Sequence, residues 1–296
     1  KLLITTYDNY TYFYKFKNSL NIQTAFLQTS YNKPYKDYLS KEFKKNGINK
    51  NYFVDHMFVW GKSIKKELKK YIQGKFYTSG SFRNNSFPNN YKKKTKVITS
   101  ITFISQYRKI KSISQPVPSG KTVKCLDDYC LKNKILLKIL LYGTPHVKGR
   151  ACQNYNDELN FYNNLNLKCD YKILVRSHVY ESYKILIKQD LIITNDSSLG
   201  QEMLARGKKV VFFGLRHKIF HPMRGTHMFG WPSKFNKKGP FWLDYYAPSE
   251  LFKIISRISK MKNSKWNQLI KQYQKKLIIY DYKNKYLIKK LSSIIN

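Results

Sequence analysis

Residues 190–214 read DLIITNDSSLGQEMLARGKKVVFFG, and this stretch decides the fold class. LIIT and VVFF are short apolar runs typical of buried strands. NDSS supplies side chains that turn the chain and cap a helix, and Gly207 ends that helix. The order strand, turn, helix, strand is the repeating unit of an α/β protein with a parallel sheet.

The start of this helix has the properties of a phosphate-binding site, because a helix N-terminus presents backbone N–H groups and partial positive charge. Ser197 and Ser198 lie at this end, and Gly200 in the first turn permits close approach of a bulky ligand. Glu202 lies in the first turns and can accept hydrogen bonds from ribose hydroxyls. A plain strand–helix–strand unit whose helix is capped by serine fits the same residues, so both interpretations stay open on physical grounds.

Apolar runs alternate with amphipathic stretches along the rest of the chain, which predicts an α/β fold. A polar loop containing proline is expected at Gln106–Lys121. Strands are expected at Leu2–Thr6, Thr24–Gln28, His56–Trp60, Lys75–Ser79, Val97–Ile104, Ile135–Leu141, Lys172–Arg176, Leu191–Thr194 and Val210–Phe213. Helices are expected at Tyr10–Leu20, Ser63–Ile72, Leu126–Lys132, Asp157–Leu165, Tyr180–Lys188 and Leu199–Arg206, with two or three closing helices after Pro248.

Residues 84–96, NNSFPNNYKKKTK, combine Asn, Pro and charge without periodicity, which is typical of a linker. We therefore predict two α/β domains, residues 1–92 and 93–296. The chain opens with KLLITTYDN, a strand already under way and without an initiator methionine. We expect from this that residues are missing upstream and that the N-terminal domain is truncated.

The composition is strongly basic, with 56 Lys and Arg against 17 Asp and Glu and a formal net charge of +39. Such an excess attracts polyanions such as nucleic acid, anionic lipid headgroups or phosphorylated substrates. Lysine is spread over every segment, however, beside abundant Asn, Ile and Tyr, and an AT-rich coding sequence produces the same pattern. The aromatic residues fall in core-periodic segments without an RNA-binding or zinc-finger pattern, so specific nucleic-acid binding is not predicted. No apolar run reaches the ~18 residues of a membrane span.

Several polar side chains follow the predicted strands directly. Ligands of open parallel sheets bind beyond the carboxyl ends of the strands, so these side chains are candidates for a binding site. Arginine can hold a phosphate bidentately, and histidine can hold a phosphate or move a proton, although a structural histidine at a strand end is as common. The candidates in the second domain are Ser105, Gln106, Arg108, Arg176 and His178.

Asp8 and Asn9 follow the first strand in the same way. A carboxylate at this place can deprotonate an acceptor hydroxyl. Asp and Asn are also good caps for the predicted helix Tyr10–Leu20. Asp8 is therefore a candidate general base with a structural alternative.

The stretch RHKIFHPMRGTHMFG at 216–230 follows the strand VVFF and contains three histidines. Pro222 and Gly225 argue against a helix that would hold these histidines at metal-ligand spacing. An anion-binding loop led by Arg216 is the better interpretation. Asp127-Asp128, at an expected helix start, is interpreted as a capping pair. No metal site is therefore predicted.

The segment NDSSLGQE resembles the donor-site unit of GT-B glycosyltransferases, whose second domain carries a D-S-[ST]-x-x-x-E type pattern. More narrowly, the chain resembles bacterial surface-carbohydrate and O-antigen biosynthesis proteins, which are distant relatives of capsule-polysaccharide and glycerophosphate transferases. The segments VDHMFVWG at 54–61, GSFRNN at 80–85, FISQYR at 103–108 and FGWPSKFNKKGPFW at 229–242 fit the same group.

The resemblance implies two Rossmann-like domains of GT-B type with the active site in the cleft between them. It places Gly80, Ser81, Arg83 and Asn84 on the acceptor side of that cleft, although a turn with a surface arginine fits this run as well. It also implies transfer of a sugar from a nucleotide-activated donor to a saccharide or lipid-linked acceptor. No cofactor and no metal are expected, because the helix dipole and basic side chains stabilise the leaving diphosphate.

We therefore expect a cytoplasmic glycosyltransferase, peripheral to the inner face of the plasma membrane where its lysines meet anionic lipid. A sugar-nucleotide epimerase of the same fold and a non-enzymatic polyanion-binding protein are the alternatives. Asp8 and His178 are the candidate catalytic residues. The residues expected to hold the donor and its phosphates are Ser197, Ser198, Gly200, Glu202, Ser105, Gln106, Arg108, Arg176 and Arg216, and those on the acceptor side are Asn9, Gly80, Ser81, Arg83 and Asn84.

Overall fold

The computed structural model describes residues 1–6, 13–14, 21–29, 52–89, 97–107, 116–146, 154–178, 180–215 and 228–295. The chain forms two compact units. Unit 1 comprises Lys1–Asn89, Gly230–Lys234 and Ile270–Asn296, and unit 2 comprises Asn90–Phe229 and Phe235–Leu269. The division predicted from the sequence differs in two respects, since it places both Gly230–Lys234 and Ile270–Asn296 with the second domain, whereas these segments group with unit 1.

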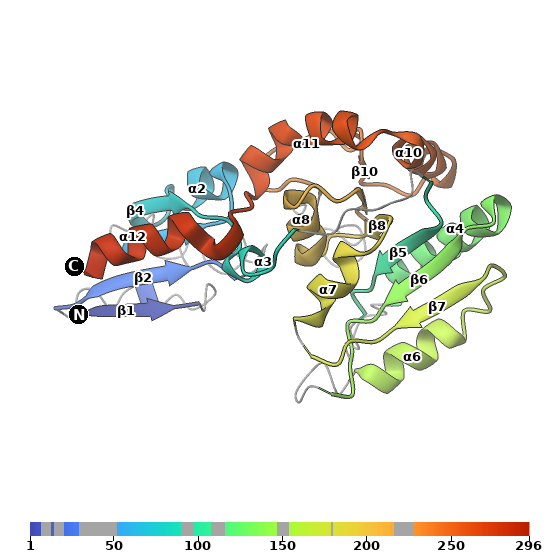
Figure 1. The fold of residues 1–296 in the computed structure, drawn as a ribbon, viewed down its shortest axis with the longest axis horizontal. Coiled ribbons are helices and arrows are strands. Elements are labelled where there is room, and N and C mark those ends of the chain that lie inside the picture. Colours follow the sequence, from blue (N-terminus) through green and yellow to red (C-terminus); the bar gives the residue numbers. More distant parts are fainter. Residues whose placement is uncertain are drawn as a thin grey trace. The chain divides into compact units, whose positions relative to one another are not determined.

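Unit 1 is built on four parallel strands in the order β1 (Leu2–Thr5), β2 (Gln23–Leu27), β3 (Phe53–Val59) and β4 (Gln73–Thr78) (Figure 1). The helix α2 (Lys62–Leu68) buries Ile64 and Leu68, and the short helix α3 (Phe82–Asn85) follows β4. The last helix, α12 (Lys285–Ile295), packs Leu287 against Ala25 and Phe58. The end of the chain therefore contributes to the core of the unit that its beginning forms.

Unit 2 is built on six parallel strands. The order across the sheet is β10 (Trp242–Leu243), β9 (Val210–Phe213), β8 (Leu191–Thr194), β5 (Ser100–Ile104), β6 (Leu136–Leu140) and β7 (Tyr171–Leu174). Counted along the chain this is the doubly wound order of a Rossmann fold, and its direction reverses between β5 and β8. β5, β8 and β9 are wholly buried, which explains why LIIT in β8 and VVFF in β9 are almost continuously apolar, while β5 (SITFI) includes two small hydroxyl side chains.

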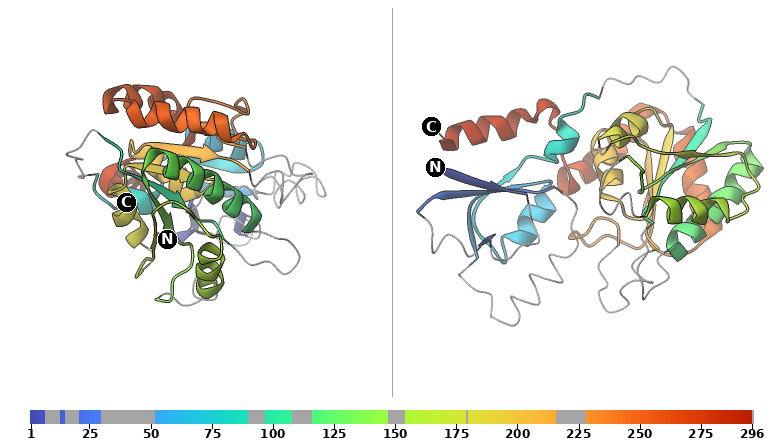
Figure 2. Two further views of the ribbon diagram at one scale, coloured as in Figure 1. Left: turned by 90° about the vertical axis from the view of Figure 1, so that its right-hand side faces the viewer. Right: turned by 90° about the horizontal axis from the view of Figure 1, so that it is seen from below.

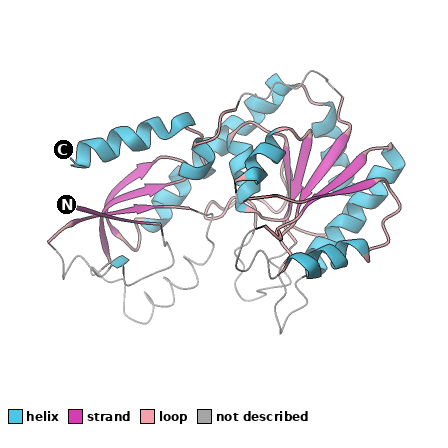
Figure 3. Ribbon diagram, turned by 60° about the horizontal axis from the view of Figure 1, so that its bottom comes forward, coloured by secondary structure: helices cyan, strands magenta, loops and turns pink. Residues whose placement is uncertain are grey.

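Helices flank this sheet on both faces (Figures 2 and 3). α4 (Pro116–Asn133) and α6 (Tyr155–Asn163) cover one face, and α7 (Glu181–Ile187) and α8 (Ser198–Ala205) cover the other. Right-handed crossovers on the two sides of the reversal point place the helices in this way. α10 (Pro248–Lys260) and α11 (Asn263–Leu277) follow β10, and no helix among the described residues is long and apolar enough to span a membrane.

The predicted strands Leu191–Thr194 and Val210–Phe213 coincide with β8 and β9, and the other predicted strands differ at their ends by at most three residues. The loop predicted at Gln106–Lys121 is wrong in its second half, because α4 begins at Pro116. Proline is well tolerated in the first turn of a helix, where its missing N–H has no partner to lose. The short elements α3 and β10 were not predicted, and the predicted helix Tyr10–Leu20 lies almost entirely outside the described residues.

Candidate functional site

The loops that follow β5 and β8 meet at the reversal point of the unit 2 sheet. Gln106 follows β5, and its Oε1 accepts a hydrogen bond from the Asp196 N–H at 2.9 Å. On the β8 side, Thr194 Oγ1 accepts from the Ser197 N–H at 3.1 Å. The sequence places Gln106 and Ser197 in one donor site, and the structure brings their loops into direct contact at the position where α/β sheets bind ligands.

α8 begins at this point with a serine cap. Ser197 Oγ accepts from the Leu199 N–H at 3.2 Å, and Ser197 O accepts from the N–H groups of Gly200 at 3.0 Å and Gln201 at 3.3 Å. Three backbone N–H groups at the start of α8, which a phosphate was expected to use, therefore already have Ser197 as their acceptor. The positive end of the helix dipole remains, and Asp196, Ser197, Ser198 and Leu199 are all half-buried and so reachable by a ligand.

Gly200 faces the sheet. A Cβ at this position would lie 2.6 Å from Thr194 Cγ2 and 3.3 Å from Phe212 Cε1. The glycine is therefore required for close packing of α8 on β8 and β9, which is one of the glycine roles in dinucleotide-binding folds. This corrects the expectation that Gly200 makes room for a ligand.

Glu202 lies one turn after the start of α8, and it is 4% exposed. Its Oε2 accepts from the Tyr183 hydroxyl of α7 at 2.9 Å. The carboxylate is thus held in place by a neighbouring helix, so the role expected for it at the ribose has to coexist with this internal bond.

Ser105, also expected to contact the donor, has its hydroxyl in an internal network. It donates to Glu158 Oε1 and accepts from the Tyr162 hydroxyl at 2.7 Å and from the Tyr107 N–H at 3.1 Å. Ser105 is 3% exposed. In this structure Ser105 therefore organises the loop after β5 from inside.

Glu158 of α6 is the centre of this network. It has no exposed surface, and it also accepts from the N–H groups of Tyr142 at 3.0 Å and Gly143 at 2.5 Å, in the loop after β6. Burial raises the pKa of this carboxyl to about 7, against the opposing effects of its hydrogen bonds and of Arg176. A group that changes charge near neutral pH thus lies directly behind the candidate site.

The loops after β6 and β7 are tied to each other. Arg176 Nη2 donates to Tyr142 O at 2.7 Å, and Thr144 Oγ1 donates to Arg176 O at 2.5 Å. Burial lowers the pKa of the half-buried Arg176 guanidinium, and its buried Nε has no partner among the described residues. His178, in the same loop after β7, is exposed.

Asn195 sits at the end of β8 and was not singled out from the sequence. Its Nδ2 donates to Thr122 Oγ1 and to Phe213 O, both at 2.8 Å. Because these bonds reach α4 and β9, Asn195 fixes the strand end from which the turn to α8 starts. Among the described residues its Oδ1 has no partner.

In unit 1 the run Gly80–Asn85 binds the C-terminal part of the chain. Gly80 has φ +76°, and a Cβ there would lie 2.2 Å from Ile279 O. Asn85 Nδ2 donates to Ser79 O at 2.9 Å, and Asn85 Oδ1 accepts from the Asp281 N–H at 3.0 Å. The acceptor-side candidates Gly80, Ser81 and Asn84 are buried in this arrangement, whereas Arg83 is half-buried and lies against the Phe82 ring.

Four predicted site residues lie outside the described residues, namely Asp8, Asn9, Arg108 and Arg216, as does most of the stretch 216–230. Asp127 lies inside α4 and accepts from the Lys168 N–H at 2.9 Å and the Cys169 N–H at 2.8 Å. The prediction that Asp127-Asp128 caps a helix start is therefore wrong. Within the described ranges, no group of three His, Cys, Asp or Glu residues is placed to hold a metal ion.

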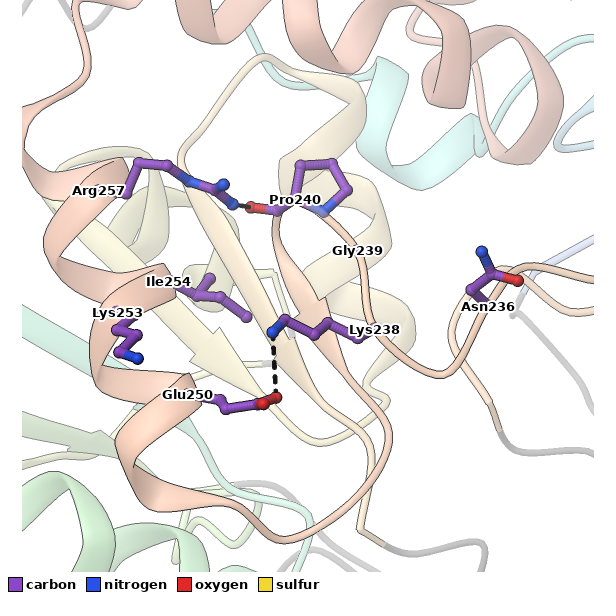
Figure 4. A pocket seen from close by; sticks show the side chains of 8 residues that line it. All are labelled: Asn236, Lys238, Gly239, Pro240, Glu250, Lys253, Ile254 and Arg257. Atoms are coloured by element: carbon purple, nitrogen blue, oxygen red, sulfur yellow. Dashed lines mark hydrogen bonds and ion pairs between the residues drawn. The ribbon is translucent and has the colours of Figure 1, made fainter.

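A separate surface hollow of about 750 Å³ lies beside β10 and α10 (Figure 4). Lys238 Nζ pairs with Glu250 Oε2 at 3.3 Å on one side, and Arg257 donates to Pro240 O on the other. The lysines and the arginine are exposed. None of the site residues predicted from the sequence lines this hollow, so the reversal point of the sheet remains the candidate site.

Sequence reasoning missed Glu158 and Tyr162. Both lie on the buried face of α6, four residues apart. An acidic residue on the face of a helix that also carries a buried aromatic is the signal that could have identified Glu158, since unpaired carboxylates are seldom buried. The signal is weak because the hydrogen-bond donors come from segments 15 and 53 residues away.

A family model described as "putative O-antigen biosynthesis protein" matches residues 25–295. Among curated proteins none matches the sequence. Similar solved structures include the wall teichoic acid polymerase TagF soaked with CDPG, at a TM-score of 0.55 and 12% identity over 100% of this chain and 73% of that chain. A UDP-GlcNAc 2-epimerase from Methanocaldococcus jannaschii in complex with UDP-GlcNAc and UDP has a TM-score of 0.55 and 11% identity over 92% of this chain and 69% of that chain. At such identities the likeness shows the fold, and the expected GT-B class is confirmed.

Proposed function

Because the chain belongs to the family of O-antigen biosynthesis proteins, we propose that it is a glycosyltransferase that uses a nucleotide-activated sugar. The acceptor is a saccharide or a lipid-linked saccharide. An acceptor hydroxyl attacks the anomeric carbon, the bond from that carbon to the donor phosphate breaks, and the nucleoside phosphate leaves with its electron pair.

The observation that carries the proposal is the serine-capped start of α8 at the reversal point of a Rossmann-ordered sheet. The loop after β5 is joined to this start through Gln106 and Asp196. A ligand with a diphosphate is suited to the place because the helix dipole favours negative charge there. The similar structures contain CDPG in TagF and UDP-GlcNAc with UDP in the epimerase, which agrees with a nucleotide-linked donor.

In the proposed reaction the protein stabilises the leaving diphosphate by charge and by hydrogen bonds. Ser197 and Ser198 hold the phosphates, and Glu202 holds the ribose. Arg108, Arg176 and Arg216 offset the developing negative charge, so the proposed transfer needs no metal. Asp8 and His178 are the proposed candidates for the base that accepts the acceptor proton.

We place the enzyme in the cytoplasm, at the inner face of the membrane. A formal net charge of +39 favours contact with anionic lipid. A sugar-nucleotide epimerase is the second candidate, favoured by the TM-score that the epimerase shares with TagF. Product analysis separates the two, because an epimerase converts the donor without any acceptor.

The test is a thermal-shift or saturation-transfer NMR panel of UDP-, GDP-, CDP- and CMP-linked donors. We expect one nucleotide class to bind, and we expect Glu202→Gln to weaken that binding about tenfold. Tyr183→Phe tests the internal bond separately, because it removes the hydroxyl bonded to Glu202 and keeps the carboxylate, and it should weaken binding less than Glu202→Gln. No response to any donor, together with RNA binding that falls steeply with salt, contradicts the proposal and favours a polyanion-binding protein.

A further inference from the structure

Two buried carboxylates hold loops at opposite ends of the unit 2 sheet. Asp127 of α4 accepts from the Lys168 and Cys169 N–H groups, which precede β7 and so lie at the amino ends of the strands. Glu158 of α6 accepts from groups that follow β5 and β6 and so lies at the carboxyl ends. Only the second carboxylate is next to the candidate site.

The fit around Glu158 is tight. Gly143 brings its N–H close because it lacks a side chain: a Cβ there would lie 2.7 Å from Tyr155 Cα and 3.0 Å from Glu158 Oε2. Both carboxylate oxygens accept hydrogen bonds, Oε1 from Ser105 and Tyr142 and Oε2 from Gly143. Among the described residues, Arg176 and Tyr162 are the charged or titratable groups that act on this carboxyl.

The charge of Glu158 determines how many hydrogen bonds it can accept from the loops after β5 and β6. An ionised carboxylate accepts at both oxygens, whereas a protonated carboxyl turns one oxygen into a donor. On Oε2 that donor faces the Gly143 N–H, which also donates. On Oε1 it faces the Tyr142 N–H and the Ser105 hydroxyl, whose two lone pairs already accept from Tyr162 and Tyr107. Protonation therefore breaks one of the three bonds that hold the loops after β5 and β6.

The β5 loop leads directly to the binding site. Ser105, bonded to Glu158, is followed by Gln106, which bonds the Asp196 N–H beside the Ser197 cap. A shift of Ser105 is transmitted through one peptide unit to the contact that joins the β5 and β8 loops. Burial raises the pKa of the Glu158 carboxyl to about 7, so its change of charge falls in the physiological pH range, which supports such a coupling.

We propose that Glu158 is a positioning residue of the donor site, which binds the nucleotide donor tightly when Glu158 is ionised and weakly when it is protonated. The inference rests on the proposed function, since it concerns affinity for the donor. Glu158 itself does not touch the donor in this scheme. It acts through Ser105, Tyr142 and Gly143.

The experiment is calorimetric titration of the full chain with UDP-GlcNAc, GDP-mannose and CDP-glycerol between pH 5.5 and 8.5. These probes are diphosphate diesters and carry no phosphate monoester that titrates near pH 6. We expect the affinity of the unmodified protein to rise about tenfold across this range. Glu158→Gln should bind with the low-pH affinity at every pH, because the amide also presents a donor to the loop.

Asp127→Asn is the matched control, a buried carboxylate with backbone N–H partners at the opposite end of the sheet. It should keep the pH profile of the unmodified protein. A Glu158→Gln protein that is folded and shows the unmodified pH profile overturns the proposal.

Hydrogen exchange separates this proposal from the proposed function. If no donor of the UDP-, GDP-, CDP- and CMP-linked panel binds, the proposed function fails, and the positioning role is still measured at the amides of Tyr142, Gly143 and Asp196. Glu158→Gln should lower their protection at least tenfold at pH 8, and Asp127→Asn should not. Unchanged protection at these amides in Glu158→Gln overturns the positioning role.

Discussion

Two segments of the molecule share one local design and differ in what covers them. Ser79–Asn85 follows β4 and Asn195–Glu202 follows β8, and each turns from a parallel strand into a helix capped by serine. Ser81 Oγ accepts from the Asn84 N–H at 3.4 Å, and Ser197 Oγ accepts from the Leu199 N–H at 3.2 Å.

The difference lies in what covers each cap. In unit 1 the turn is buried, because the C-terminal segment Ile279–Asn284 lies on it. Asn284 Nδ2 donates to Phe82 O at 2.9 Å, and Tyr280 donates to Phe87 O at 2.6 Å. In unit 2 the turn at Asp196–Leu199 stays half-buried. A strand–cap–helix turn thus serves as a docking point for the chain in one unit and as a candidate ligand site in the other.

The largest effect should come from Gly80→Ala, which attacks the docking point. The new Cβ combines a left-handed φ of +76° with a 2.2 Å approach to Ile279 O, and a backbone carbonyl has little freedom to move away. We expect a loss of more than about 3 kcal/mol in the free energy of unfolding of unit 1. Hydrogen exchange of the amides at 278–284 and urea unfolding measure it.

Gly207→Ala is the comparison for this change, and its effect is measured on the unfolding of unit 2. Gly207 also has a left-handed φ, +80°, but its added Cβ would meet only Asn267 Oδ1 at 3.2 Å. Gly207→Ala should lower the free energy of unfolding by about 1 kcal/mol, because the alanine has to adopt the left-handed backbone conformation. Equal losses for the two variants would show that the contact with Ile279 is unimportant.

The second effect is a pH dependence of the stability of unit 2, which arises from Glu158. Its pKa of about 7 in the folded state lies above its ordinary value of 4.5, so between these values the folded protein binds the proton more tightly than the unfolded chain. The stabilisation is complete below pH 4.5 and is lost as the pH rises to 7. The free energy of unfolding should therefore fall by up to about 3 kcal/mol.

The measurement is urea unfolding of unit 2 at pH 5 and pH 8 in the unmodified protein and in Glu158→Gln. The difference between the two proteins isolates the contribution of this carboxyl from those of other titrating groups. If both lose the same stability with rising pH, Glu158 is not the source. If only the unmodified protein loses stability between pH 5 and pH 8, the ionised Glu158 carboxylate lowers the free energy of unfolding of unit 2 near neutral pH.

The third effect is that of Gly200→Ala on the open turn. The added Cβ would lie 2.6 Å from Thr194 Cγ2, and we expect about 1–3 kcal/mol of destabilisation by overpacking. Donor affinity should change less than twofold in the folded fraction, because this glycine faces the sheet. Thr194→Ser removes the methyl group in question and keeps the oxygen that accepts from Ser197. The double variant should therefore recover most of the lost stability, and a purely additive result would contradict the packing role.

The sequence predicted the local part of both turns and not their surroundings. Apolar runs and short polar residues were sufficient to predict β8, α8 and the cap of Ser197. The sequence could not show that Asn85 binds a backbone N–H 196 residues later in the chain, since that contact depends on tertiary packing. For the same reason the sequence could not show that Gly200 faces the sheet or that Ser105 bonds Glu158. Both contacts, of Gly200 with Thr194 and of Ser105 with Glu158, depend on tertiary packing.

The smallest effect compares the two caps directly. Ser81→Ala and Ser197→Ala each remove a side-chain acceptor at a helix start, and each should cost about 1 kcal/mol of stability. Only Ser197→Ala should also lower the affinity for the donor, by about fivefold, because the hydroxyl at the half-buried turn is the one that a phosphate can reach. Thermal unfolding and donor titration of the two variants provide the comparison. Equal donor affinities in both would place the phosphate away from the α8 cap, and the two turns would then differ in their exposure and not in their use.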